Sequence, residues 1–168
     1  MRSLLEEYVP RVYRFALRLT NDPHAAEDLT QETVLRAWRR QALLRNPQAA
    51  RVWLFRIAVN LWRDQLRRGR SRVAQAGPLA DDQADHGPAP DRQAAEQDDL
   101  RRALEAVTKL PDRQREVVHL SACEGLSAGE IAEILAISPD AVKASLCLAR
   151  KRLRHELKDV YENLFPAV

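Results

Sequence analysis

The chain has 168 residues and a formal net charge of +3, a length that allows one ordinary domain or two small ones but excludes a multidomain enzyme. The charge is uneven: residues 1–70 carry 14 basic and 7 acidic side chains, residues 71–100 carry 2 and 7, and residues 101–168 carry 11 and 10. This division predicts two folded pieces joined by an acidic linker, with the first piece the better partner for a polyanion.

The chain lacks the signals of several protein classes. No apolar run approaches the roughly 18 residues that a membrane span needs, and acids near the start argue against a signal peptide, so we expect a cytoplasmic protein. Two cysteines are too few for a disulfide framework. Because motifs for phosphate, dinucleotide or zinc binding and for a nucleophilic serine are missing, we expect no enzyme and no cofactor.

Apolar residues at three- and four-residue steps predict three helices in the first piece, over residues 3–20, 23–40 and 47–68. Asp22 and Asn46 are expected to cap the second and third helices, since each precedes a proline that suits the first helical position. The second helix is expected to bury Ala26, Leu29, Val34, Ala37 and Trp38. Residues 1–69 are therefore predicted to form a helical bundle.

Residues 70–97 form the predicted linker. They contain three prolines, two glycines and many Ala, Asp and Gln residues, without periodicity and almost without large apolar side chains. Such a segment cannot bury enough surface to offset its ordering entropy, so we expect a flexible, acidic connection.

Residues 98–168 are also predicted to be helical throughout. One helix ends at Leu110, before a proline, and another covers residues 112–122 and ends near Gly125. His119 and Cys123, four residues apart, lack a second ligand pair nearby, so we predict a packed helix there rather than a metal site.

The most informative spacing lies at residues 127–154. Ser127 and Glu130 fit a capping box that starts a short helix, and Ser138 is expected to cap a long helix after a three-residue turn. This is the spacing of a helix-turn-helix, whose second helix enters the major groove of DNA. An ordinary helical hairpin with a solvated basic face fits the spacing equally well. The outward face of the long helix is expected to carry Asp140, Lys143, Ala144, Cys147, Arg150, Lys151 and Arg154.

The first piece carries an independent signal for nucleic acid. Residues 40–72 contain nine arginines and one acid, interleaved with Trp53, Phe55 and Trp62. Arginines attract phosphates and aromatic rings stack on unpaired bases, a combination used on single-stranded nucleic acid. In so small a bundle, however, Trp53 and Phe55 are expected in the core, because large apolar rings are usually buried.

Three stretches, in the right order, resemble the extracytoplasmic-function sigma factors of bacterial RNA polymerase. Residues 26–38, AEDLTQETVLRAW, look like the core-binding helix of that family. Residues 53–64, WLFRIAVNLWRD, look like its promoter-melting and −10-reading helix. Residues 110–117, with 124–127 and 130–132, look like its −35-reading domain. The resemblance covers the chain apart from the linker and the extreme ends.

The resemblance implies an all-α fold of two small domains, a promoter-melting helical bundle and a helix-turn-helix domain, joined by a flexible linker. It implies contact with core RNA polymerase by Asp28, Gln31, Glu32 and Arg36. It implies contact with −10 promoter DNA by Arg45, Arg56, Asn60, Arg63, Arg67 and Arg68. It implies contact with −35 DNA by Lys143, Ala144, Cys147, Arg150, Lys151 and Arg154. It further implies a loop at residues 41–48 that captures a flipped base, and an anti-sigma factor as inhibitor. Asp64 is expected to pair with a nearby arginine.

The second piece also departs from the family. Ser145 and Leu148 stand where arginine is common, and Asp140 adds a negative charge near the expected phosphate path, which predicts weaker or altered −35 contact. Two alternatives remain open: a stand-alone helix-turn-helix regulator, and a sigma-like decoy that sequesters an anti-sigma factor without binding DNA. Polymerase subunits in a pull-down would argue against the first, and salt-dependent promoter binding against the second.

Overall fold

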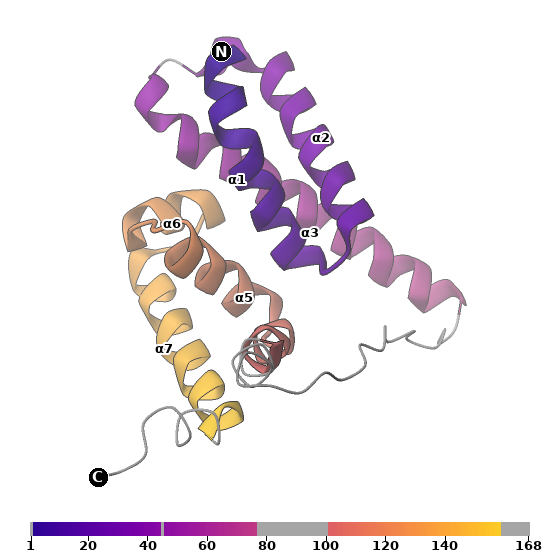
Figure 1. The fold of residues 1–168 in the computed structure, drawn as a ribbon, viewed down its shortest axis with the longest axis vertical. Helices are drawn as coiled ribbons and strands as arrows, with labels where there is room; N and C mark the ends of the chain where they lie inside the picture. The colour runs from indigo at the N-terminus through magenta and orange to yellow at the C-terminus, as the bar shows by residue number, and fades with distance from the viewer. Residues whose placement is uncertain (1, 45, 77–100, 159–168) are drawn as a thin grey trace, which may run out of the picture.

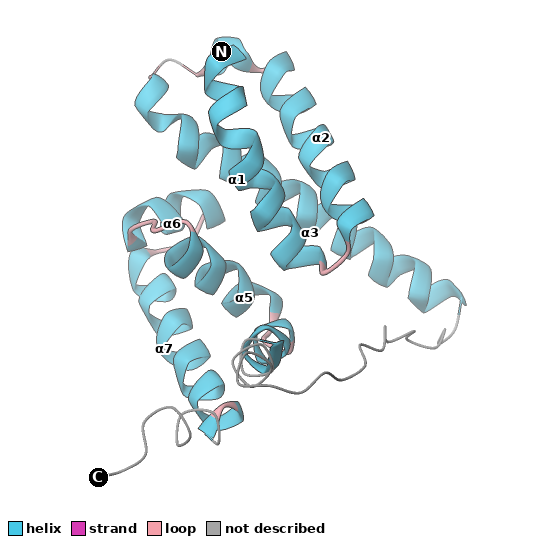
Figure 2. Cartoon of the chain, viewed as in Figure 1, coloured by secondary structure: helices cyan, strands magenta, loops and turns pink. Residues whose placement is uncertain are grey.

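The computed structural model describes residues 2–44, 46–76 and 101–158, which are helical apart from short connections (Figures 1 and 2). The first domain contains α1 (Arg2–Thr20), α2 (Pro23–Arg39), two short 3₁₀ turns, η1 (Gln41–Leu43) and η2 (Pro47–Ala49), and α3 (Ala50–Ala76). The second contains a helical stretch at residues 101–108, then α5 (Asp112–Val118), the π-helical turn η3 (His119–Cys123), α6 (Ala128–Leu135) and α7 (Pro139–Glu156). The predicted all-α, two-domain fold is confirmed.

Local capping explains where the helices of the first domain begin. The Asp22 carboxylate accepts hydrogen bonds from the backbone N–H groups of His24 (2.8 Å) and Ala25 (3.2 Å), and Pro23 occupies the first helical position of α2. The Asn46 side chain accepts from the Gln48 N–H at 2.9 Å and begins η2, which leads directly into α3. Both predicted caps are confirmed.

Phe15 of α1 and Phe55 of α3 pack edge to face in the core of the first domain. Their ring centroids lie 5.2 Å apart, and the ring planes form an angle of 86°. From α2 the core receives Leu29, two alanines and two buried threonines rather than a tryptophan. The hydroxyls of Thr30 and Thr33 donate to the backbone carbonyls four residues earlier, each at 2.7 Å, which satisfies them in the interior. The predicted burial of Trp38 is wrong, because that side chain is 49% exposed.

Helix α3 continues beyond its predicted end at residue 68, as far as Ala76. A single glycine at position 69 costs a helix only about 1 kcal/mol, and the residues after it are mostly good helix formers. The beginning of the segment expected to be a linker is therefore helical. Its remainder, residues 77–97, lies outside the described residues.

The second domain forms the predicted helix-turn-helix. The Ser127 hydroxyl accepts from the Glu130 N–H, and the Glu130 carboxylate accepts from the Ser127 N–H at 2.8 Å, so the capping box is present in full. Ala136, in the left-handed conformation (φ +53°), ends α6, and the Ser138 hydroxyl accepts from the Ala141 N–H to start α7. Gly125 has φ +63°, as its predicted role at a helix end requires.

The two domains pack against each other, with α6 against α3 and η3 close to α1. The buried apolar side chains of both form one continuous cluster. Among the described helices, none is both long enough and apolar enough to cross a membrane.

Candidate nucleic-acid interface

Four of the six predicted −10 contacts lie on one face of α3. Arg56, Asn60, Arg63 and Arg67 follow one another at helical spacing, opposite the buried side chains of Leu54, Phe55 and Ala58. Arg56, Asn60, Arg67 and Arg68 are exposed. Arg45 lies outside the described residues. The exposed members give this face a positive charge that suits phosphates.

Arg63 differs from its neighbours because the second domain already binds it. Its Nε and Nη2 donate to the two carboxylate oxygens of Glu116 at 3.0 and 2.7 Å, and its Nη1 donates to the Leu135 carbonyl at 3.3 Å. The Glu116 side chain is only 1% exposed. This two-pronged geometry is the strongest form of a carboxylate–guanidinium contact. Arg67 pairs with Asp64, which confirms the predicted pairing of that acid.

The predicted −35 face of α7 is open. All seven residues expected on the outward face are exposed, while Val142 and Ala149 are buried on the opposite side. Lys143 Nζ lies 3.3 Å from the Asp140 carboxylate, and both side chains are strongly exposed. An ion pair of this kind adds little stability, but it lowers the positive charge presented to DNA.

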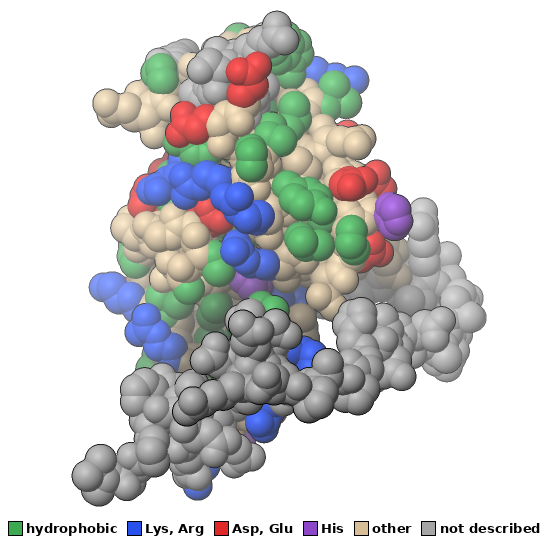
Figure 3. All heavy atoms as spheres, in the orientation of Figure 1, with side chains coloured by type: hydrophobic (Ala, Val, Ile, Leu, Met, Phe, Trp, Pro, Cys, Tyr) green, Lys and Arg blue, Asp and Glu red, His purple; other side chains and the backbone are tan. Residues whose placement is uncertain are grey.

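The predicted polymerase-binding face of α2 contains exposed apolar residues as well as the predicted polar ones. Asp28 and Gln31 are exposed, and Glu32 forms an ion pair with Arg36 at 2.7 Å. Leu35 and Trp38 are also exposed, and they lie seven and ten residues after Asp28, on the same side of the helix. This helical spacing was a signal in the sequence that Leu35 and Trp38 lie on the exposed side of the helix and not in the core. Figure 3 shows apolar and acidic side chains side by side around α2.

Four further contacts between the domains have no signal in the sequence. Arg11 Nε lies 3.0 Å from a Glu124 carboxylate oxygen, and that carboxylate also faces Arg18 at 3.8 Å. Arg51 Nη2 lies 2.5 Å from Glu130. The Arg115 guanidinium sits over the Trp62 ring. Figure 3 shows basic side chains gathered where the two domains meet.

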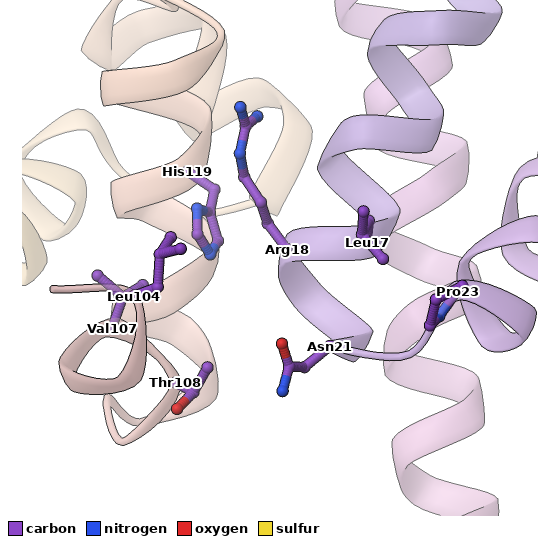
Figure 4. Close-up of a pocket in the computed structure, with 8 residues that line it drawn as sticks. All are labelled: Leu17, Arg18, Asn21, Pro23, Leu104, Val107, Thr108 and His119. Carbon is purple, nitrogen blue, oxygen red and sulfur yellow. The ribbon is translucent and has the colours of Figure 1, made fainter. Parts of the chain in front are cut away.

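A cavity of about 500 Å³ also lies between the domains (Figure 4). Its lining comes from both domains: Leu17, Arg18, Asn21, Pro23, Leu104, Val107, Thr108 and His119. Burial, together with the charges of Arg18 and Arg115, lowers the pKa of His119 to about 4, so the ring is neutral at pH 7. Cys123 Sγ lies 3.9 Å from its Nδ1. Within the described ranges, no group of three or more potential metal ligands occurs.

Comparisons with known proteins match both domains. Residues 4–72 match the family model for Sigma-70 region 2, and residues 100–153 match that for Sigma-70, region 4. The chain is 40% identical over 149 residues to the probable RNA polymerase sigma factor RfaY of Xanthomonas campestris pv. campestris, covering 87% of this chain and 37% of that protein. It is 35% identical over 161 residues to the ECF RNA polymerase sigma factor SigL of Mycobacterium tuberculosis, covering 95% and 90%.

The arrangement of the two domains also has a counterpart among solved structures. The sigma factor RpoE of Bartonella quintana, crystallised in complex with the anti-sigma factor NepR, matches with a TM-score of 0.77 and 26% identity. The match covers 94% of this chain and 96% of that one, so it includes both domains.

Proposed function

The chain belongs to the extracytoplasmic-function sigma factors of the sigma-70 family, and on that premise we propose that it binds core RNA polymerase and directs promoter recognition, DNA melting and transcription initiation. The observation that carries the proposal is that both sigma regions occur in one chain, in order, with cationic residues exposed on α3 and α7. It acts as a DNA-binding regulatory protein without catalysis of its own, in the cytoplasm, where the polymerase works.

The exposed face of α2 is the proposed polymerase contact. Acidic and amide groups at Asp28, Gln31 and Glu32 suit a basic partner, and Leu35 and Trp38 add apolar area that association would remove from water. Large exposed rings next to polar groups are typical of binding hot spots. Arg36 orients Glu32 through their ion pair.

The DNA-binding faces of the two domains are proposed to contact different promoter elements. Residues 41–48 and the exposed side of α3 would hold the opened −10 element, and the outward face of α7 would enter the major groove at −35. The predicted division places the two domains at residues 1–69 and 98–168, and α3 continues as far as Ala76, beyond the first of these bounds. An anti-sigma factor is the proposed inhibitor, by analogy with the complex of RpoE and NepR.

Transcription from a randomised promoter library tests the proposal. Purified core polymerase with this protein should give transcripts that core alone does not, and sequencing their templates would identify both promoter elements. Absence of transcripts together with absence of core binding would contradict the proposal. Core binding without any salt-dependent affinity for promoter DNA would instead favour the decoy. The match of residues 4–72 to region 2 argues against a stand-alone regulator, because it accounts for the first domain.

A further inference from the structure

The cavity of about 500 Å³ between the domains lies apart from the proposed polymerase and DNA surfaces (Figure 4). On one side are the end of α1 and the turn into α2, and on the other are the helical stretch at residues 101–108 and η3. Among the described residues that line it, none belongs to α3 or α7, the proposed DNA helices. Its volume is within the range of about 300–1,000 Å³ that is usual for small-molecule sites.

Most of the cavity wall is apolar. Figure 4 shows Leu17 and Pro23 of the first domain on one side and Leu104 and Val107 of the second on the other. Leu104 remains 51% exposed, so the packing of the domains does not cover this apolar surface completely. Such a concave surface favours a ligand with an apolar body, because binding removes the exposed apolar area from water.

One polar side chain in the wall is buried and lacks a partner. His119 is only 5% exposed, and its Nε2 is buried without a hydrogen bond. An interaction with the Arg18 backbone favours the protonated ring, but it does not satisfy Nε2. His119 begins the π-helical turn η3, a kind of turn that is frequent at functional sites. Figure 4 shows its ring between Leu104 and the Arg18 side chain. A ligand that pairs with Nε2 would remove the cost of this unpaired group.

The other ring nitrogen determines the role that Nε2 can take. Nδ1 of His119 lies 3.9 Å from Cys123 Sγ. A thiol is a hydrogen-bond donor, and with the thiol donating to Nδ1 a neutral ring carries its proton on Nε2. The ring is neutral at pH 7, because burial, together with the charges of Arg18 and Arg115, lowers its pKa to about 4. Nε2 is therefore a donor without an acceptor.

The charges around His119 favour an anionic acceptor over a neutral one. Arg18 and Arg115 both lower the pKa of the ring, which indicates a positive potential at its position. Each arginine has an acid beside it, Glu124 at 3.8 Å and Asp112 at 3.0 Å, and the effect on the pKa persists. Arg18 Nη1 is also buried without a hydrogen bond. A carboxylate meets both requirements, because it accepts hydrogen bonds and carries a negative charge.

We propose that this cavity is a binding site for a small monocarboxylate with an apolar body. The carboxylate accepts from His119 Nε2 in the positive potential of Arg18, and the apolar body lies among Leu17, Leu104 and Val107. The ligand contacts both domains, so it stabilises their packed arrangement more strongly as its concentration rises. The site does not rest on the proposed function, because none of these five residues belongs to a proposed polymerase or DNA contact.

Octanoate and octanol test the site as a matched pair, because they have the same apolar chain and only octanoate carries a carboxylate. The full chain, labelled with ¹⁵N-histidine, is titrated with each probe at pH 7 and followed by NMR of the ring nitrogens. The chain has four histidines, so the other three serve as references for His119. Octanoate should shift the His119 Nε2 resonance with a Kd on the order of 1 mM, and octanol should bind about tenfold more weakly.

Three variants of the full chain locate the site, with affinities measured from the NMR signals of the probes. His119→Phe removes the Nε2 donor and keeps an aromatic ring, so octanoate should bind about tenfold more weakly while octanol binds as before. His155→Phe is the matched control, because His155 is exposed on α7 and undergoes the same change. Leu104→Trp fills the cavity from a half-exposed position and should abolish binding of both probes. Circular dichroism confirms that each variant keeps its helical content.

The two parts of the proposal have separate contrary results. Equal affinities for the two probes, or full octanoate binding by His119→Phe, would overturn the role of the carboxylate. Binding that persists in Leu104→Trp, or an octanoate titration that leaves the His119 resonance unshifted, would overturn the cavity as the site. None of these results bears on initiation, which the promoter library tests independently.

Discussion

The Arg115 guanidinium carbon of α5 lies 5.8 Å from the centre of the Trp62 ring of α3, so a cation of the second domain covers an aromatic ring of the first. Trp62 is only 9% exposed, and its indole Nε1 is buried without a hydrogen-bond partner. The ring thus contributes packing and a cation–π contact, while its unpaired N–H group costs free energy.

Trp62→Phe should therefore be tolerated much better than Trp62→Ala. Phenylalanine keeps most of the buried area and removes an unsatisfied donor, so we expect a loss of about 1 kcal/mol in the free energy of unfolding, against about 3–5 kcal/mol for alanine. Urea unfolding followed by circular dichroism measures both. Equal losses would show that the indole makes a specific contact that a phenyl ring cannot replace.

Trp38→Ala should weaken binding to core polymerase by about tenfold or more without weakening the fold. The side chain is 49% exposed, and large aromatic residues dominate binding energies at interfaces. Leu148→Ala is the matched control, because Leu148 is 53% exposed but lies on α7. Fluorescence anisotropy with labelled protein gives both affinities. Similar effects of the two substitutions would place the polymerase contact elsewhere.

Asp140→Asn should strengthen binding to −35 duplex DNA. The change removes a negative charge from the α7 face and releases Lys143 from its ion pair. One more available cation should steepen the salt dependence of binding by about one unit of slope. The duplex comes from the promoter library, and Arg150→Ala should have the opposite effect. No response to either change would exclude the outward face of α7 as the DNA surface.

Stability should fall as the pH drops from about 6.5 to about 4 because of His119. Its pKa is lowered from 6.5 to about 4 in the folded protein, so in this range the unfolded chain binds a proton that the folded chain does not. The contribution is fully present above pH 6.5 and declines by at most about 3 kcal/mol toward pH 4. His119→Gln should flatten this part of the stability profile, measured by urea unfolding at several pH values. A profile with the wild-type slope would assign the effect to other groups.

Ser127→Ala should destabilise the second domain by about 1 kcal/mol, because it removes a helix cap. Hydrogen bonds from Ser127 and Arg51 lower the pKa of Glu130 to about 2. The stabilisation from Glu130 is therefore present above about pH 4.5 and is lost as the pH falls toward 2. Ser127→Ala removes some of the hydrogen bonds that lower this pKa, so the loss of stability should begin at a higher pH in the variant. Ser145→Ala, within α7, is the control and should be neutral in thermal unfolding. Equal losses of stability in Ser127→Ala and Ser145→Ala would rule out a capping contribution from Ser127.

Local signals in the sequence were sufficient to predict where helices begin. Asp22, Asn46, Ser127 and Ser138 each act within three residues, so a short stretch of sequence contains both the cap and its target. The end of α3 was not predictable in this way, because a single glycine weakens a helix without stopping it. Trp38 was misplaced because apolar character alone does not distinguish a buried residue from an exposed one.

The occupation of Arg63 could not be predicted from the sequence. Glu116 is 53 residues away, and nothing local marks it as a partner for one arginine among many. Arg56, Asn60 and Arg67, which the resemblance implies for −10 contact, share one face of α3 with Arg63, but whether each cation is available depends on the packing of the other domain. Pairings of this kind emerge only from the tertiary structure.

The burial of Glu116 and Glu124 against arginines has a consequence for the free protein in a cell. Genomic DNA offers an enormous excess of non-specific sites, and affinity for them grows with the number of cations that can displace counterions from the phosphates. Cations that are paired with the protein's own carboxylates displace no counterions from the phosphates. Non-specific affinity for bulk DNA therefore rests on the exposed cations of α3 and α7, and the arginines that Glu116 and Glu124 hold add little to it.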